Sequence, residues 1–272
     1  MSDILTYKPA KTTEEMINYL NENKRIFFND IDKEKAKEIL LRYNYINVIT
    51  PFKHRFARLD NSRQVVKIAG KHIYDRDVEF SEYYSLYKEE RSKYQTIYSN
   101  IMEFETHFKS ILSYYIVNKT VDKIENSVDL YNFVTKIETS IALKNSYTSE
   151  RKKHMNEHIE SLKKDIEKYH DVYCFFDRTS LGPLLTVYIG LDNNKQEDIL
   201  NELKKFNMNF GIDQVPQFIN KVFTLVGIRN CIMHNNSLEI LVRFYNPKTK
   251  ELRHSTDKKS FTNLIAYLSK EK

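Results

Sequence analysis

The stretch that decides the fold is VPQFINKVFTLVGIRNCIMHNN, residues 215–236. Its apolar residues recur every three or four positions, which predicts a helix with one buried face. These residues are Val215, Phe218, Ile219, Val222, Phe223 and Val226. Asp213 precedes the segment as a candidate N-cap, and Pro216 fits the first turn. Asn235 and Asn236 follow the last apolar residues and are expected to close the helix.

Three polar residues lie in the last turns of this helix: Arg229, Asn230 and His234. Asn230 and His234 are four positions apart, about 40° around a helix, and they continue the apolar stripe. We therefore expect these two side chains to face inward or toward a partner. Arg229 lies about 140° from His234 on an ideal helix. The two share a site only through the reach of the arginine, a frayed helix end or a second copy of the chain.

The three residue types suit the cleavage of RNA without a metal ion. Histidine has an unperturbed pKa near neutrality, so it can help to deprotonate a ribose 2′-OH. Arginine is a permanent forked cation that stabilises charge on a pentavalent phosphate. Arginine and histidine also stand close together in a charged segment, as Arg151 and His158. The trio in residues 229–234 differs because it ends an apolar face, where polar groups need partners or a function.

GIRNCIMHNNSL resembles the Arg-Asn-x-x-x-His signature of HEPN-domain ribonucleases. Four further stretches, in the same order along the chain, resemble one branch of that superfamily, the Abi-like (abortive infection, AbiD/AbiF type) proteins. They are KTTEEMINYL, LLRYNYINVITPFKHRF, YYSLYKEERSKYQTIYSNIMEFETHFKSILSYYI and LGPLLTVYIGL. The matches run from about residue 11 to residue 238. Where the family has Asp-x-x-Leu-Arg, this chain has Glu90 and Arg91 with shifted neighbours.

The resemblance implies a HEPN-like helical bundle and an endoribonuclease of the abortive-infection or toxin type. It implies a homodimer in which two copies of the Arg-Asn-x-x-x-His helix meet, and a small non-coding antitoxin RNA as a further partner. His234 would be the general base or acid, Arg229 would bind the phosphate, and Asn230 would position the helix end or the substrate. The expected products carry a 2′,3′-cyclic phosphate and a 5′-hydroxyl.

Glu105 is the fourth candidate for the catalytic site. It lies beside a helical stripe formed by Ile97, Ile101, Phe104, Phe108, Leu112 and Tyr115, four positions before Lys109. It matches the acidic residue of the family helix that packs against the Arg-Asn-x-x-x-His helix. There it would pair with Arg229 or Lys109, or tune His234, because a buried carboxylate needs a partner. The alternative is a surface Glu–Lys pair of small energy.

Cations and aromatic residues alternate between residues 42 and 63, a composition suited to single-stranded RNA. From this region we select Lys53, His54, Arg55 and Arg58 as RNA-binding candidates, and we add Lys109. An equally good interpretation is a solvated basic face over an aromatic core. Two short helices before this region also allow a helix-turn-helix, although no recognition helix rich in base-reading residues follows.

Composition bounds the remaining possibilities. The 272 residues include only 5 Gly and 5 Pro, which favours a mainly α fold, and the net charge of +6 permits a polyanion partner. Cys174 and Cys231 form neither a disulfide framework nor a metal motif. His154 and His158 have zinc-like spacing, but no Cys or HExxH accompanies them. We predict no metal, no cofactor, no membrane span and a cytoplasmic location.

We predict two parts, an N-terminal helical basic and aromatic segment at 1–77 and a HEPN-like helical domain at 78–272. Capping signals at Thr12 with Glu15, and at Asp30 or Asp32, predict two helices in the first part. In the second part, helices are expected at 80–118 (one bent or two), 128–143, 149–170, 182–190, 198–206, 215–236 and 258–268. Alternation from residue 238 to 245 and a turn at 246–248 predict a small β-hairpin through residue 252.

Three functions remain open at this stage. The first is the metal-independent endoribonuclease. The second is a non-catalytic module that binds RNA, such as a small non-coding RNA, and does not turn it over. The third is a structural or regulatory dimer, or a DNA-binding regulator.

Overall fold

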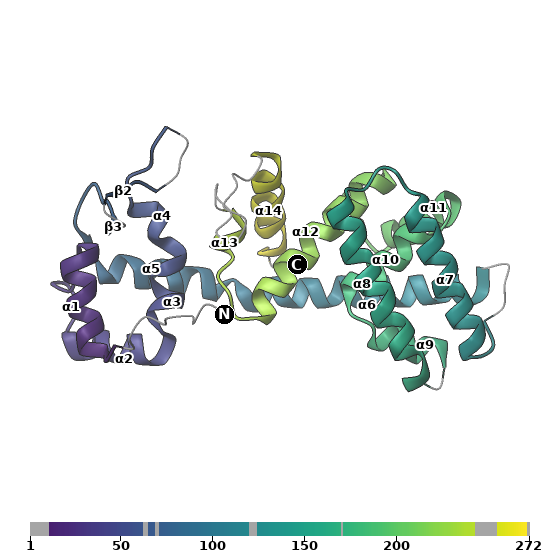
Figure 1. Cartoon of the computed structure of the whole chain (residues 1–272), viewed down its shortest axis with the longest axis horizontal. Helices are drawn as coiled ribbons and strands as arrows, with labels where there is room; N and C mark the ends of the chain where they lie inside the picture. Colours follow the sequence, from purple (N-terminus) through teal and green to yellow (C-terminus); the bar gives the residue numbers. More distant parts are fainter. Residues whose placement is uncertain are drawn as a thin grey trace, which may run out of the picture. The chain divides into compact units, whose positions relative to one another are not determined.

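The computed structural model describes residues 11–61, 65–68, 71–119, 124–169, 171–242 and 255–270. The chain is mainly α-helical, as predicted (Figure 1). Its contacts divide it into two compact units: unit 1 is Met1–Gln95 with Cys231–Asn263, and unit 2 is Thr96–Asn230 with Leu264–Lys272. The predicted boundary after residue 77 does not coincide with this division of contacts, and the two predicted parts remain a prediction.

Unit 1 combines short helices with two small two-stranded sheets. Its elements are α1 (Thr13–Lys24), β1 (Ile26–Phe27), α2 (Lys33–Tyr43), α3 (Tyr45–Val48), the 3-10 helix η1 (Thr50–Phe52), α4 (Lys53–Phe56), β2 (Lys67–Ile68), β3 (Lys71–His72), β4 (Val78–Glu79), α5 (Phe80–Ser92) and α13 (Glu239–Val242). β1 pairs in parallel with β4, and β2 pairs antiparallel with β3. Residues 61–77, which the sequence predicts to be a connection, contain β2 and β3, while β1 and β4 lie outside that stretch.

The first helices of unit 1 begin where the sequence predicts. Thr12 and Glu15 form the expected capping box, in which Thr12 Oγ1 accepts from Glu15 N at 3.2 Å and Glu15 Oε2 accepts from Thr12 N at 2.7 Å. Asp32, one of the two candidates, caps α2. The helices bury a core to which α5 contributes Phe80 and Tyr83, both fully buried. This core fixes α5, whose last turn contacts the residues that follow the Arg-Asn-x-x-x-His helix.

Unit 2 is built from longer helices. Its elements are α6 (Tyr94–Lys119), α7 (Ser127–Leu143), α8 (Ser149–Asp165), the 3-10 helix η2 (Ile166–Lys168), α9 (Val172–Arg178), α10 (Leu181–Gly190), α11 (Asn193–Lys205), α12 (Val215–Met233) and α14 (Ser255–Leu268). The division between the units falls inside α6, α12 and α14. Residues 80–119 form two helices, α5 and α6, separated at Lys93, which is one of the two predicted arrangements.

The core of unit 2 joins α6 to α12 and α10 through aromatic side chains. The ring centroid of Phe218 on α12 lies 6.3 Å from that of Phe104 and 6.4 Å from that of Phe108, both on α6. Tyr188 on α10 meets Phe218 edge to face at 5.8 Å. Such contacts contribute about 0.5–1.5 kcal/mol each beyond burial. They hold together the two helices that carry Glu105 and Arg229.

A second group of helices, α7, α8 and α10, pack against one another in unit 2 (Figure 1). The last residue of α10, Gly190, lies directly against Ile137 of α7. A Cβ at Gly190 would be 2.4 Å from Ile137 Cγ2, which is far inside van der Waals contact. Only glycine allows this close approach of the two helices.

Two predictions about the ends of elements are wrong. Asp213 does not cap α12: Gln214 O accepts the first helical bond, from Phe218 N, and the Asp213 carboxylate pairs with Lys204 at 2.8 Å. Residues 239–242 form α13 and not a strand, because Ser237 Oγ accepts from Glu239 N at 3.2 Å and starts a helical turn. The rest of the predicted hairpin, residues 243–252, lies outside the described residues.

Candidate active site

The C-terminal end of α12 closes as the sequence predicts. Asn235 adopts a left-handed conformation with φ of 55°. Its N–H donates to Ile232 O, and Asn236 N–H donates to Cys231 O, both at 2.9 Å. This pair of hydrogen bonds is the Schellman motif, so His234 occupies the C-cap position. The motif histidine therefore stands at the helix end and is followed by a tight turn.

The side chains of the trio differ in exposure. Arg229 is partly buried, while Asn230 and His234 are exposed. In the last turns of α12 the fully buried residues are Leu225 and Ile228. Asn230 lies about 160° around the helix from Ile228, on nearly the opposite side. The expectation that Asn230 and His234 point inward is therefore wrong. Their orientation toward a partner remains a prediction.

Glu105 joins Arg229 to Lys109 inside unit 2. Its side chain is 3% exposed. Oε2 accepts from Arg229 Nε at 3.0 Å, and Oε1 pairs with Lys109 Nζ at 3.2 Å. The predicted pairing is confirmed with both partners, and the alternative of a surface Glu–Lys pair is wrong. We call Glu105, Lys109, Arg229 and Asn230 the Arg229 group.

The ion pair holds the guanidinium by one edge. Arg229 uses Nε for Glu105, and its Nη1 lies 3.4 Å from Asn230 Oδ1. A carboxylate that is buried beside a cation fixes the direction of the cation more than it stabilises the fold. The arrangement therefore orients Arg229 through one nitrogen. Among the described residues, its other nitrogens have only a long contact, to the neighbouring amide.

Lys109 was selected as an RNA-binding residue from the sequence. Its ammonium pairs with Glu105 and also donates to the Asp177 carbonyl oxygen at 2.8 Å, and the side chain is 17% exposed. Through these contacts Lys109 helps to hold the Glu105 carboxylate. A direct contact with RNA remains a prediction.

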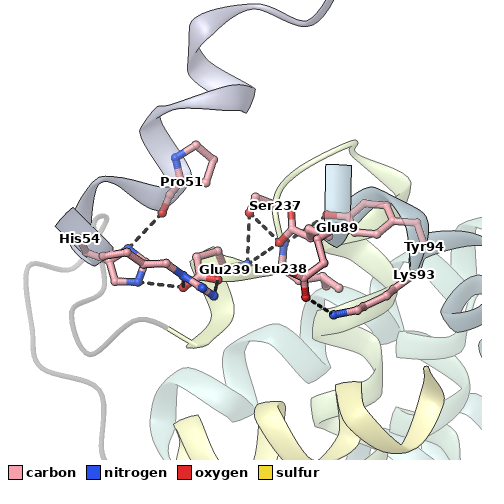
Figure 2. A network of polar contacts seen from close by, with 10 residues as sticks. Pro51, His54, Glu89, Lys93, Tyr94, Ser237, Leu238 and Glu239 are labelled. Atoms are coloured by element: carbon pink, nitrogen blue, oxygen red, sulfur yellow. Dashed lines mark hydrogen bonds and ion pairs between the residues drawn. The ribbon is translucent and has the colours of Figure 1, made fainter. Parts of the chain in front are cut away.

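Two other RNA-binding candidates, His54 and Arg55 on α4, lie in unit 1 and pair with the same carboxylate, that of Glu239. Figure 2 shows His54 directed toward Glu239. His54 Nε2 lies 2.8 Å from Glu239 Oε1, and Arg55 donates to both oxygens of Glu239 at 3.1 and 2.7 Å. Burial acts to raise the pKa of Glu239, but the hydrogen bonds from His54 and Arg55 outweigh it and lower the pKa to about 2. Glu239 is therefore ionised at neutral pH and offsets the charge of Arg55.

The remaining candidates in this region also have partners. Arg58 pairs with Asp75, and Lys53 Nζ lies 5.8 Å from the ring centroid of Tyr45. The sequence could not anticipate the acidic partners, because Arg55 and Glu239 are 184 positions apart. Binding of RNA by Lys53, His54, Arg55 and Arg58 remains a prediction.

The sequence interpretation missed the residues that hold the segment after His234. They are Glu90, Arg91 and Tyr94, at the end of α5 and the start of α6. One signal was present in the sequence, since Glu90 and Arg91 stand where the resemblance to the family is weakest.

The division between the two units falls within the Arg-Asn-x-x-x-His motif. Arg229 and Asn230 belong to unit 2, and His234 belongs to unit 1. The described residues contain no group of three or more His, Cys, Asp or Glu side chains placed to bind a metal ion. Within the described ranges, no helix combines the length and the apolar character needed to cross a membrane.

Comparison with known proteins places the chain in a family. A family model described as Abi-like protein matches residues 38–238, which is most of the chain. The chain therefore belongs to the Abi-like protein family, and this membership implies a role in abortive infection. No curated protein and no solved structure matches the chain.

Proposed function

We propose that this protein is a metal-independent endoribonuclease of the abortive-infection type, with a HEPN-like site formed by Arg229, Asn230 and His234. The observation that carries the proposal is the Arg229 group, in which a buried carboxylate orients the arginine of the motif. A protein that needed this arginine only for packing would gain little from so costly a buried charge.

Each residue of the site has a chemical role in the proposal. His234 takes the proton of the ribose 2′-OH or gives one to the leaving 5′-oxygen, and its exposure gives RNA access to the imidazole. Arg229 stabilises the pentavalent phosphate, with Glu105 fixing the guanidinium. Asn230 contacts the substrate or the helix end. The attacking oxygen belongs to the RNA, so the products carry a 2′,3′-cyclic phosphate and a 5′-hydroxyl.

We further propose that the working enzyme is a homodimer. Arg229 and His234 are about 140° apart around a helix, and their side chains differ in burial. Two copies related by a two-fold axis would bring Arg229 of one subunit to His234 of the other. This arrangement supplies both residues to one phosphate without distorting the helix.

The first experiment compares RNA cleavage by wild type, His234→Ala and His154→Ala in excess EDTA. His154 is an exposed histidine on α8 and makes the matched control. Cleavage by wild type and His154→Ala, with loss of at least about 100-fold in His234→Ala, is expected. Equal cleavage by His234→Ala and wild type contradicts the assignment. Tight, salt-dependent RNA binding without cleavage by wild type would indicate the binding module instead.

A mixing experiment tests the shared site. Arg229→Ala and His234→Ala are each expected to be inactive alone. If the site takes Arg229 and His234 from different subunits, a mixed dimer contains one intact site, and mixing the two variants restores activity. If mixing restores nothing while mixed dimers are shown to form, each site takes both residues from one subunit.

A further inference from the structure

The segment that follows the motif histidine, residues 235–239, is held by an unusual number of side chains from elsewhere in unit 1. Three of them come from one short stretch: Glu90, Arg91 and Tyr94. We call these three residues the α5 clamp and residues 235–239 the His234 loop. Neither the motif nor the proposed reaction assigns them a role.

Arg91 holds the residue directly after His234. Its Nη1 donates to Asn235 Oδ1 at 2.5 Å, and its Nη2 donates to Asn235 O at 2.9 Å. The guanidinium also contacts two rings, 5.1 Å from the centroid of Tyr87 and 4.5 Å from that of Tyr94. Two hydrogen bonds and two cation–π contacts restrict the orientation of the guanidinium. Asn235 is the left-handed residue of the helix end, so Arg91 fixes the turn that ends α12.

Tyr94 and Glu90 hold the next residues of the loop, and Figure 2 shows Tyr94 beside Ser237 and Leu238. Tyr94 Oη donates to Asn236 O at 2.6 Å and accepts from Leu238 N at 3.2 Å. Glu90 Oε1 accepts from Ser237 Oγ at 2.8 Å and from Glu239 N at 2.9 Å. Every residue of the His234 loop therefore bonds to the clamp through at least one atom.

The far end of the loop is held from α4. Glu239 is gripped by His54 and Arg55, and His54 is itself oriented by Pro51 O, which lies 3.1 Å from its Nδ1 (Figure 2). The loop is thus fixed at both ends. Ser237, Leu238 and Glu239 are buried, so their polar groups need such partners for stability, but Asn235 and Asn236 are exposed. The contacts from Arg91 and Tyr94 to these two residues exceed what an exposed helix end needs, since such an end is normally satisfied by water or a single cap.

We propose that Arg91 and Tyr94 are positioning residues for His234: by fixing Asn235 and Asn236 they set where the imidazole is presented to the substrate. The inference rests on the proposed ribonuclease function of His234. A displacement of about 1 Å at a reacting group can cost about 100-fold in rate. Loosening the loop therefore lowers the rate of the chemical step and leaves RNA binding largely unchanged.

Tyr94→Phe is the sharpest test because it removes one hydroxyl and keeps the ring. Tyr98→Phe, about one turn further along α6, is the matched control. We expect Tyr94→Phe to lower kcat about tenfold with little change in KM, while Tyr98→Phe cleaves like wild type. A rise in KM with unchanged kcat would overturn the proposal, because it would mean that the clamp serves binding.

Arg91 is tested by a graded pair of variants. Arg91→Ala removes both hydrogen bonds and is expected to lower kcat by about 100-fold. Arg91→Lys keeps the charge but not the fork, so its rate should lie between those of Arg91→Ala and wild type. Arg178→Ala, an exposed arginine on α9, is the control. Should Arg91→Ala fail to fold by circular dichroism, Tyr94→Phe decides alone.

A second measurement separates this inference from the proposed function. The NMR signal of the His234 imidazole, assigned by its loss in His234→Ala, reports its surroundings without any substrate. We expect the signal to move or broaden in Tyr94→Phe and Arg91→Lys and to stay in place in Tyr98→Phe. An unchanged signal in both clamp variants overturns the inference. If wild type cleaves no RNA but the signal responds, the proposed function fails and the positioning of His234 stands.

Discussion

The buried pairing of Arg229 with Glu105 makes a prediction about stability that needs no knowledge of the substrate. In Arg229→Met the stem of the side chain is kept and the guanidinium is lost. Among the described residues, the Glu105 carboxylate, 3% exposed, then keeps Lys109 as its only ionic partner. The variant should therefore lose stability as well as activity.

The size of the loss follows from the geometry. Removing one partner of a fully buried ion pair costs about 3–5 kcal/mol. Two features reduce this figure: the Arg229 side chain is 21% exposed, and Lys109 still lies 3.2 Å from Glu105. We expect a loss of about 2 kcal/mol in the free energy of unfolding, or about 4–8 °C in Tm. Adding Glu105→Leu removes the stranded charge, so the double variant should recover at least about 1 kcal/mol relative to Arg229→Met.

The assay is urea unfolding followed by circular dichroism for wild type, Arg229→Met, Glu105→Leu and the double variant. A coupling energy of at least about 1 kcal/mol between the two positions is expected. Additive effects, with coupling below about 0.3 kcal/mol, would refute the reasoning. A loss below about 0.5 kcal/mol in Arg229→Met, the level of an ordinary surface change, would refute it as well.

Three further predictions concern other parts of the chain. The pKa of Glu239 falls from its ordinary 4.5 to about 2, so its ion pairs stabilise the fold above pH 4.5, and this contribution is lost as the pH falls toward 2. Glu239→Gln should remove on the order of 3 kcal/mol of this pH-dependent stability. The variant should therefore show a flatter plot of unfolding free energy against pH between pH 4.5 and 2 than wild type does. Gly190→Ala should lower the free energy of unfolding by about 1–3 kcal/mol in urea titration, because the new methyl group would overlap Ile137, and an unchanged midpoint would contradict this contact. A thiol reagent should react with one cysteine in the folded protein, the exposed Cys174, and reach the buried Cys231 only after unfolding; two fast thiols in the folded protein would contradict the burial of Cys231.

Much of the helical architecture could be predicted because its signals are local. Thr12 and Asp32 begin their helices through side chains three residues from their partners. The end of α12 likewise depends on Asn235, a residue type that tolerates the left-handed conformation. Such features need only a few consecutive residues, so periodicity and capping rules are sufficient to locate them.

The errors come from contacts between residues distant in the sequence. The alternating residues after Leu238 favour a strand, yet Glu239 is drawn into a helical turn by Ser237, Glu90 and Arg55. The Ser237 contact is local, but Glu90 and Arg55 lie 149 and 184 positions from Glu239, so no local rule contains them. Tertiary hydrogen bonds overrode the β propensity of the segment.

The candidate site was predicted in part for the same reason. The pairing of Glu105 could be expected, because helical spacing places it beside a buried stripe and next to Lys109. The exposure of Asn230 and His234 was not predicted, because the stripe was extended from Val226, whereas the fully buried positions are Leu225 and Ile228. The acidic partner of His54 and Arg55 was equally hidden from the sequence.

The most direct test of the central claim is the chemistry of the RNA ends. Wild type is incubated in excess EDTA with an RNA and with the same RNA carrying 2′-deoxy residues at the cleaved positions, and the products are examined by mass spectrometry. The account predicts a 2′,3′-cyclic phosphate and a 5′-hydroxyl from the first substrate and no cleavage of the second, because the 2′-OH is the attacking group. Products with a 5′-phosphate, or equal cleavage of the deoxy-substituted RNA, would contradict it.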